Sequence, residues 1–584
     1  MLSTEISTRP QGKGDDRSNH VVGLPPELWR MVGAELQSDI ALRALRSMSH
    51  SFRDIFTPFA FDAYTLRLKS ASQLENLKLP EITCHVKSLC IYVNPNPWEM
   101  TIGDEIDKVA ELLVRILRKM SNIRSLQWID DGSDRHQCIL LLRNTDLLDY
   151  FKSLENLQNL AIQFGAGDWA YGDFGSNNCS TELRGFKNLI SLELYSFYGD
   201  FQVILKDIAG TLAECPHLKK LGLGVGNKSA WGEEQEEEET AARDEIIILE
   251  EMNMLESLCL QYGSQTKAQP LKIHTLRLGF SMFLTEPTSP ASGNYLTKLL
   301  DIRTLKCLEM YNGYVVDDLE KAQDISEWLH LANPAWELLD DCRLRQLGVT
   351  TIDARVTNYL YGAGNCVEEL SISGANFRDL PAIQRFDFNR LSNLKSFWMH
   401  EKFSHRDLED EETELGADLE ETEQKFILNR LYDGGSKLVT LAINIDFNTD
   451  FTHLIALLPR MTHLVQLSLS KQEDGWLKNK YPAPKTLWPS IRTQEDINYR
   501  YAQIMSLLCT SLQYIEIGSF SWEVMTPSHL RPPAPNSLDR KIKGKLVLRR
   551  LEHREILSIE FFCRHILVNQ SGLPVSGQAN SFEE

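Results

Sequence analysis

Residues 451–469, FTHLIALLPRMTHLVQLSL, combine a helical pattern with a strand-like one. Apolar residues first recur at helical spacing, a turn follows near Pro459, and the segment ends in the hexamer LVQLSL. Alternating apolar and polar residues in such a hexamer are typical of a half-buried β-strand. The stretch therefore predicts one unit of helix, turn and strand.

The hexamer, written L-x-x-L-x-L with Ile, Val, Phe, Met or Trp also allowed, recurs fourteen times along the chain. The fourth residues of these hexamers are Leu89, Leu126, Leu160, Leu192, Leu221, Leu258, Leu276, Leu308, Leu347, Leu370, Phe397, Leu441, Leu467 and Ile515. The segments between them often read as helices, as in residues 104–120 and 201–214. One helix–turn–strand unit cannot bury its apolar face alone, whereas stacked units share a continuous core. The pattern thus predicts a repeat array.

The pattern resembles leucine-rich repeats, in which short parallel strands line the concave face of a curved array. The resemblance implies an α/β fold in which an irregular leucine-rich-repeat solenoid occupies residues 67–562. Hexamers LESLCL (255–260) and IHTLRL (273–278) lie too close together for two full helical repeats, so one of them is expected to be a short or strand-only unit. The acidic stretches 231–245 and 407–424 are expected to be exposed loops or flexible helices, and residues 540–554 a terminal strand with charged edges.

Composition narrows the function classes. The chain has 584 residues, 24% of them charged, and a net charge of −20, which works against broad binding to nucleic acid or anionic membranes. No apolar run is long enough to span a bilayer, and residues 1–20 lack the apolar core of a secretory signal. We expect a cytoplasmic or nuclear protein with a disordered leader at 1–20 and a disordered tail at 563–584. The eleven cysteines form no CxxC pair and are expected to be reduced and mostly buried.

The sequence contains no complete signature of a catalytic site. GLGVGNKS (222–229) lies one substitution from a phosphate-binding loop, but Asn227 stands where that motif has its last glycine and a strongly acidic stretch follows. No HExxH spacing or nucleophile elbow is present, and histidines such as His274, where a turn meets a strand, are expected to have structural roles. The sequence therefore predicts no catalytic residues, no metal site, no cofactor and no enzymatic activity.

Residues 23–54, GLPPELWRMVGAELQSDIALRALRSMSHSFRD, differ from the repeats. Pro25 and Pro26 suit a helix start, Ser38 or Asp39 can cap a second helix, and a third helix is expected to end at Pro58. These elements predict a three-helix module over residues 21–66, near the lower size limit for independent stability.

The order L-P-x-E-L, an apolar pair, a D-I step and a closing S-x-x-F-R closely resembles the F-box motif. The chain departs from the common motif at Met48-Ser49-His50 and at Phe52, where Trp is frequent. An F-box followed by this array resembles a fungal-type F-box and leucine-rich-repeat protein. The resemblance implies docking on a Skp-type adaptor, and through it on a cullin, by Leu24, Pro25, Leu28, Met31, Val32, Leu36, Ile40, Leu42, Leu45, Met48 and Phe52.

The family resemblance further implies a substrate-recognition subunit of a Skp-cullin-F-box ubiquitin ligase, with catalysis by other subunits and an unknown protein as target. Alternation along the strands predicts a set of residues on the concave face that would meet this target. They are Tyr92, Gln127, Glu193, Tyr195, Gln261, Arg277, Glu309, Tyr311, Trp398 and His400. A repeat scaffold that binds a partner protein without engaging a ligase is the alternative.

Overall fold

A computed structural model of the chain forms two compact units, Met1–Ala60 and Phe61–Glu584. It describes residues 24–36, 39–68, 74–75, 81–93, 106–130, 145–163, 183–197, 201–225, 254–265, 269–279, 282, 284–290, 293–310, 335–349, 354–363, 366–372, 387–399, 428, 430–445, 447, 451–471, 494–518, 520–525 and 547–551. The expected leader and tail and both acidic inserts lie outside these residues.

The first unit contains three helices, α1 (Pro26–Glu35), α2 (Asp39–Met48) and α3 (His50–Ala60). Pro26 occupies the first turn of α1, where its missing N–H costs little. The backbone N–H of Phe52 donates to Oγ of Ser49, which caps α3. The prediction that Pro58 ends α3 is wrong: the helix continues to Ala60, because a proline in the last turn removes only one backbone hydrogen bond.

The second unit is built on one open sheet of sixteen strands that follow each other in sequence order. The strands are β1 (Ala63–Leu68), β2 (Ser88–Val93), β3 (Ser125–Asp130), β4 (Asn159–Gln163), β5 (Ser191–Phe197), β6 (Lys220–Val225), β7 (Thr275–Leu278), β8 (Cys307–Met310), β9 (Gln346–Val349), β10 (Glu369–Ile372), β11 (Ser396–Met399), β12 (Thr440–Ile445), β13 (Gln466–Lys471), β14 (Tyr514–Ile517), β15 (Phe520–Met525) and β16 (Val547–Arg550). Strands β1 to β14 pair in parallel, while β14–β15 and β15–β16 are antiparallel. Thirteen of the fourteen hexamers lie on β2 to β14, which confirms an α/β fold with a solenoid-like repeat array.

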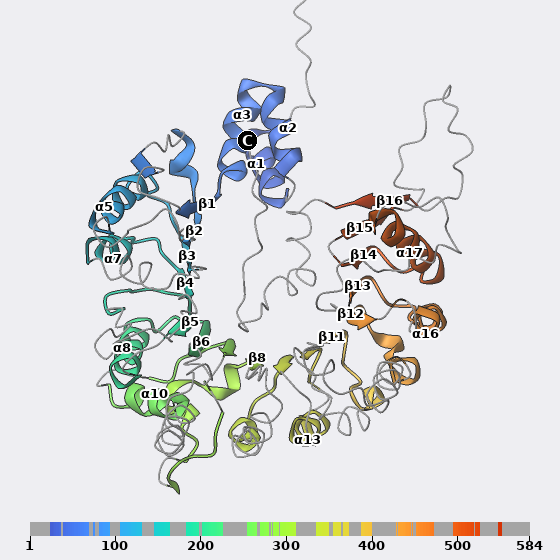
Figure 1. The fold of residues 1–584 in the computed structure, drawn as a ribbon. Coiled ribbons are helices and arrows are strands. Elements are labelled where there is room, and N and C mark those ends of the chain that lie inside the picture. Colours follow the sequence, from blue (N-terminus) through green and yellow to red (C-terminus); the bar gives the residue numbers. More distant parts are fainter. Residues whose placement is uncertain are drawn as a thin grey trace, which may run out of the picture. The chain divides into compact units, whose positions relative to one another are not determined.

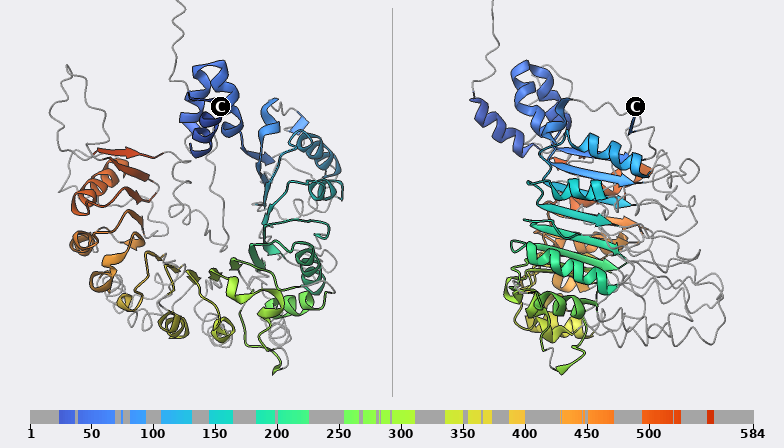
Figure 2. Two further views of the ribbon diagram at one scale, coloured as in Figure 1. Left: turned by 180° about the vertical axis from the view of Figure 1, so that it is seen from behind. Right: turned by 90° about the vertical axis from the view of Figure 1, so that its left-hand side faces the viewer.

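Helices and 3-10 turns connect the parallel strands. They are η1 (Glu81–His85), α5 (Ile106–Leu117), α7 (Thr145–Lys152), α8 (Phe201–Glu214), α10 (Met254–Gly263), α11 (Leu296–Leu299), η4 (Ile302–Thr304), η5 (Trp336–Leu339), α13 (Ala354–Ala363), η7 (Phe388–Arg390), η9 (Gly435–Lys437), α16 (Phe451–Leu457), η10 (Leu458–Arg460) and α17 (Gln494–Leu508). Within this unit the sheet curves and the labelled helices lie on its convex side (Figures 1 and 2). No helix in the described part of the chain is long and apolar enough to cross a membrane.

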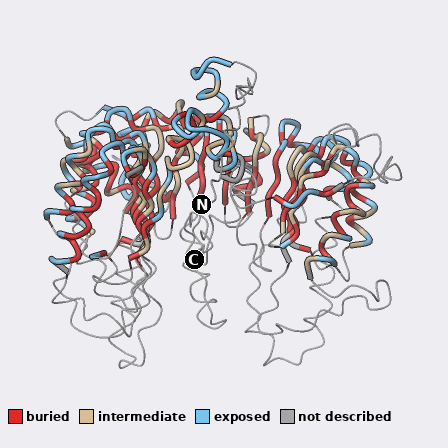
Figure 3. Tube along the Cα trace, turned by 90° about the horizontal axis from the view of Figure 1, so that it is seen from above, coloured by how far each residue is buried: buried red, intermediate tan, exposed pale blue. Residues whose placement is uncertain are grey.

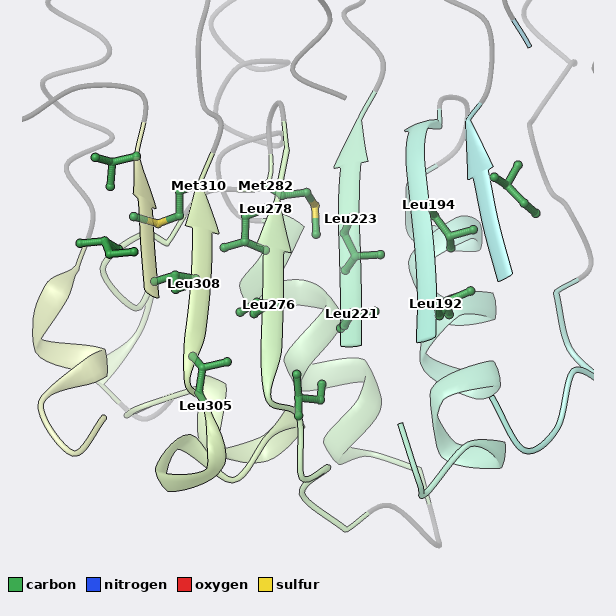
Figure 4. Close-up of a cluster of buried hydrophobic side chains, with 14 of the residues drawn as sticks. Leu192, Leu194, Leu221, Leu223, Leu276, Leu278, Met282, Leu305, Leu308 and Met310 are labelled. Atoms are coloured by element: carbon green, nitrogen blue, oxygen red, sulfur yellow. The ribbon is translucent and has the colours of Figure 1, made fainter. Parts of the chain in front are cut away.

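The core of the second unit lies between the sheet and these helices. Its repeating part is the fourth hexamer residue of each strand, so that Leu192, Leu221, Leu276 and Leu308 stand in register on β5 to β8 and are buried (Figure 4). Buried residues lie along the strands and also on the helices of this unit (Figure 3). Truncating such a leucine to alanine typically costs about 2–5 kcal/mol, so the hexamers hold the array together.

The prediction of a strand at residues 255–260 is wrong. LESLCL belongs to α10 and not to a strand, and Gln261 therefore lies on a helix, where its amide Nε2 donates to Oε1 of Gln202 on α8. Met254, Leu255, Leu258, Cys259 and Tyr262 are all buried and follow the helical period. Of these, only Leu255 and Leu258 also fit the hexamer, whose third apolar residue, Leu260, is exposed. The helical pattern extends over residues 254–262, beyond the hexamer, and this segment forms a helix.

The two ends of the array also follow from local sequence. Strand β1 starts at Ala63, ahead of the start expected at residue 67. Gly518, at φ 59°, makes the tight reversal between β14 and β15. The expected basic terminal strand is β16, the last in the sheet order, with Arg549 and Arg550 at its end.

Candidate functional site

The first unit exposes apolar residues on its surface. Leu28, Met31 and Val32 lie at positions i, i+3 and i+4 of α1 and so share one face of the helix. With Leu24 before α1 and Met48 on α2 they are 37–65% exposed, and they account for five of the ten large hydrophobic residues that are exposed in the described part of the chain. We call these five residues the exposed apolar set.

The opposite face of α1 packs inside the unit. The Trp29 ring lies 5.0 Å from the Phe52 ring, and Phe56 is fully buried beside both. A Cβ added to Gly33 would come within 2.7 Å of Cδ2 of Phe59, so glycine is required for this close approach of α1 and α3. The internal packing fixes which face of α1 remains outside.

The eleven residues expected to contact a Skp-type adaptor therefore fall into two groups. Leu24, Pro25, Leu28, Met31, Val32 and Met48 are exposed. Leu42 is buried, and Leu36, Leu45 and Phe52 are partly buried against the same internal cluster, so these four stabilise the unit itself. The side chain of Ile40 lies outside the described residues.

The residues expected on the concave face are mostly not free to meet a partner. Tyr92 is half-buried on β2, with the Arg67 guanidinium 5.8 Å from its ring, and Gln127 is half-buried on β3. Glu193, Tyr195, Glu309 and Trp398 are buried, which differs from the expected exposure. Tyr311 and His400 lie outside the described residues.

Glu193 and Glu309 belong to a charged cluster that crosses β5 to β9. Lys220 Nζ lies 2.7 Å from Glu193 Oε1. Arg277 forms ion pairs with both glutamates: its Nη1 lies 3.2 Å from Glu193 Oε2, and its Nε lies 2.7 Å from Glu309 Oε2. Tyr195 Oη donates to Glu193 Oε2 at 3.0 Å, and Gln346 Nε2 donates to Glu309 Oε1 at 3.0 Å. All four carboxylate oxygens are thus engaged.

Two glycines make room for this cluster. Gly222 stands in register between Glu193 and Arg277, and an added Cβ there would meet Tyr195 Oη and lie 3.0 Å from Glu193 Cγ. Because Gly222 has no side chain, Tyr195 lies over β6 at this position, and Arg277 reaches Glu193 across the strand. Gly348 plays the same part beside Glu309, with an added Cβ 3.1 Å from Glu309 Cγ. Gly222 of the phosphate-loop candidate therefore serves packing on β6, while Gly226 lies outside the described residues.

The cluster contains two carboxylates, Glu193 and Glu309, and two cations, Lys220 and Arg277, so its charges cancel. Burial alone would raise the pKa of Glu193, but the charges of Lys220 and Arg277 outweigh it and hold that pKa below its ordinary value. Burial, and next the negative charge of Glu193, raise the pKa of Tyr195 well above its ordinary value. Because its groups are paired, the cluster joins strands and offers no activated acid, base or nucleophile.

A second, partly buried carboxyl lies on the same sheet face near the carboxyl-terminal end of the array. Glu516 on β14 accepts from Ser468 Oγ at 2.6 Å on β13 and from Ser521 Oγ at 3.2 Å on β15. Burial raises the pKa of Glu516 to about 7, although both hydroxyl hydrogen bonds oppose the rise.

Sequence reasoning missed Lys220, Gln346 and the two glycines. A signal was available: the fifth residues of successive hexamers on β5 to β9 read Glu193, Gly222, Arg277, Glu309 and Gly348, and neighbouring strands bring them side by side. The described residues contain no group of three or more His, Cys, Asp or Glu side chains placed to hold a metal ion. Neither a family model nor a curated protein matches the chain.

Proposed function

We propose that the chain is a substrate-recognition subunit of a Skp-cullin-F-box ubiquitin ligase, resembling fungal-type F-box and leucine-rich-repeat proteins. In this proposal the exposed apolar set of the first unit docks on the Skp-type adaptor, which connects it to a cullin. The repeat array binds the target protein. The chain contributes proximity, and other subunits carry out catalysis.

The exposed apolar set is the observation that carries the proposal. A unit of this size buries a small core and is marginal by itself, and leaving three apolar side chains of one helix face in water adds nothing to its stability. An apolar helix face of this kind is a common element of protein recognition, in which residues at i, i+3 and i+4 enter a groove of the partner. The residues in question are Leu28, Met31 and Val32.

The array supports the proposal as a partner-binding surface, because solenoids present an extended concave face. On the described part of that face, Arg67 on β1 and Tyr92 on β2 are partly accessible. We propose this end of the face as a contact for the target, in place of the buried Tyr195 and Trp398.

Co-purification with a Skp-type adaptor tests the proposal. The variant carries Leu28→Asp and Met31→Asp, and a matched control carries Val203→Asp and Leu507→Asp on α8 and α17. The pairs are matched in exposure: Leu28 is 43% and Val203 44% exposed, and Met31 and Leu507 are both 65% exposed. Loss of two buried anchors at about 2 kcal/mol or more each predicts an affinity lower by roughly a thousandfold, with the control unchanged.

If the wild-type chain fails to bind the adaptor, or if the variant and its control bind equally well, the ligase proposal fails. The alternative, a repeat scaffold that binds a partner protein without a ligase, would then be the better description. Circular dichroism of the variant and control shows whether both retain their helices.

A further inference from the structure

Four consecutive strands of the array are each preceded by a basic residue. Lys219 precedes β6, His274 precedes β7, Lys306 precedes β8 and Arg345 precedes β9. We call these four residues the basic row. Lys306 and Arg345 are exposed, and Lys219 and His274 are partly exposed.

Backbone hydrogen bonds fix the row in register. The N–H of His274 donates to the carbonyl of Lys219 at 2.7 Å, that of Lys306 to His274 at 2.9 Å, and that of Arg345 to Lys306 at 2.8 Å. Since neighbouring strands lie about 4.8 Å apart, the row spans about 14 Å along the amino-terminal edge of the sheet. Lys219 and Arg345 are 126 positions apart in sequence, but the four residues lie side by side on neighbouring strands.

The row differs from the positions that continue it. On the following two strands the same positions carry Glu368 and Lys395, which form an ion pair at 2.9 Å. No ion pair with a described carboxylate involves Lys219, Lys306 or Arg345. In the part of the chain that the structure describes, the row is therefore a local concentration of positive charge without a paired carboxylate.

The environment of His274 reports the same field. Partial burial first, and then the charges of Lys219 and Lys306, lower the pKa of His274. A cation at this position is disfavoured by its neighbours unless an anion is brought to the row.

We propose that the basic row is a binding surface for a short acidic peptide segment of a partner protein. Its positive charge is complementary to carboxylates, and an extended segment of six residues, about 20 Å long, covers the row. The net charge of −20 favours a short acidic segment over a long polyanion such as nucleic acid, whose phosphates beyond the row would meet a negative protein. This inference does not depend on the adaptor-docking proposal.

Fluorescence anisotropy with the full-length chain and a labelled hexaglutamate peptide at low salt tests the proposal, with hexaglutamine as the neutral probe. The variant carries Lys306→Glu and Arg345→Glu. A control with the same change in net charge carries Arg118→Glu and Lys119→Glu, two exposed residues after α5. The expected result is hexaglutamate binding that the row variant weakens about tenfold (about 1.4 kcal/mol) and the control variant less than twofold.

A milder variant with Lys306→Gln and Arg345→Gln should give an intermediate loss, so the proposal remains testable if charge reversal disturbs folding. The proposal is overturned if the wild-type chain does not distinguish hexaglutamate from hexaglutamine, or if the control weakens binding as much as the row variant. If the chain bound hexathymidylate more tightly than hexaglutamate, the proposal of an acidic peptide would be overturned in favour of nucleic acid. A gain in hexaglutamate affinity on deleting residues 231–245 would identify the chain's own acidic insert as the occupant and overturn the partner assignment.

Discussion

Replacing Arg277 with methionine removes a side chain that pairs with both glutamates of the charged cluster. The methionine keeps an apolar stem, but Glu193 loses one of its two cations and Glu309 loses its ion pair. Removing one partner of a buried ion pair typically costs about 3–5 kcal/mol. Arg277 retains 18% side-chain exposure and Lys220 still compensates Glu193, so we expect a loss near the lower end, about 3 kcal/mol.

The loss should depend on pH in a defined direction. Because the cations hold the folded-state pKa of Glu193 below its ordinary value, its contribution is present above the unfolded pKa and disappears as pH falls through the folded pKa. The deficit of Arg277→Met relative to wild type should therefore be largest near pH 7 and shrink below about pH 4.5, the ordinary value for Glu.

Hydrogen–deuterium exchange of peptides covering β5 to β8, corrected for intrinsic rates, measures this local stability. At pH 7 the expected loss corresponds to exchange on the order of a hundredfold faster. The control Lys395→Met breaks the exposed Lys395–Glu368 pair, whose side chains are 60% and 34% exposed, and should cost less than about 1 kcal/mol. Equal effects of both substitutions at pH 7, or a deficit of the same size at pH 4, would refute the role of charge in the cluster.

Two further substitutions test the sheet face. Gly222→Ala should destabilise β5 to β7 by about 1–3 kcal/mol, because the added methyl group overlaps Tyr195, whereas Gly362→Ala on α13, with open space around it, should be neutral or slightly stabilising; equal exchange rates in the two variants would contradict the packing argument. For Glu516, a folded pKa raised to about 7 from 4.5 means that the free energy of unfolding decreases as pH rises between these values. Glu516→Gln should accordingly stabilise the end of the array by up to about 3 kcal/mol at pH 8 and by little at pH 4.5, as measured by urea unfolding; an equal effect at both pH values would exclude ionisation as the cause.

The strands could be predicted because each hexamer carries its own evidence. Leu464, Leu467 and Leu469 define both the apolar side of β13 and the turn before it, and the same holds for twelve other hexamers. Residues 255–260 show the limit of this reasoning. Leu255 and Leu258 fit a helix as well as a strand, and the packing of this segment on α8 favours the helix.

The state of the concave-face side chains could not be predicted from any one strand. Tyr195 is buried because Gly222, on the next strand, leaves space above β6, and Trp398 is buried between Ser371 and Ala442 on the strands beside it. Each environment is formed by residues that are far apart in sequence and become neighbours only through the register. Alternation predicts the side of the sheet, while the neighbouring strands decide exposure.

The helical unit illustrates the same distinction between apolar character and burial. The apolar residues in and directly after α1 divide into Trp29 and Leu36, which pack inward, and Leu28, Met31 and Val32, which do not. In the array, by contrast, the register gives nearly every apolar hexamer residue a buried place. The exposed apolar side chains of the first unit are therefore an exception to the burial that the array gives its apolar residues. They are left outside because the close approach of Gly33 to Phe59 turns the other face of α1 inward, and this arrangement supports the proposed docking on a partner.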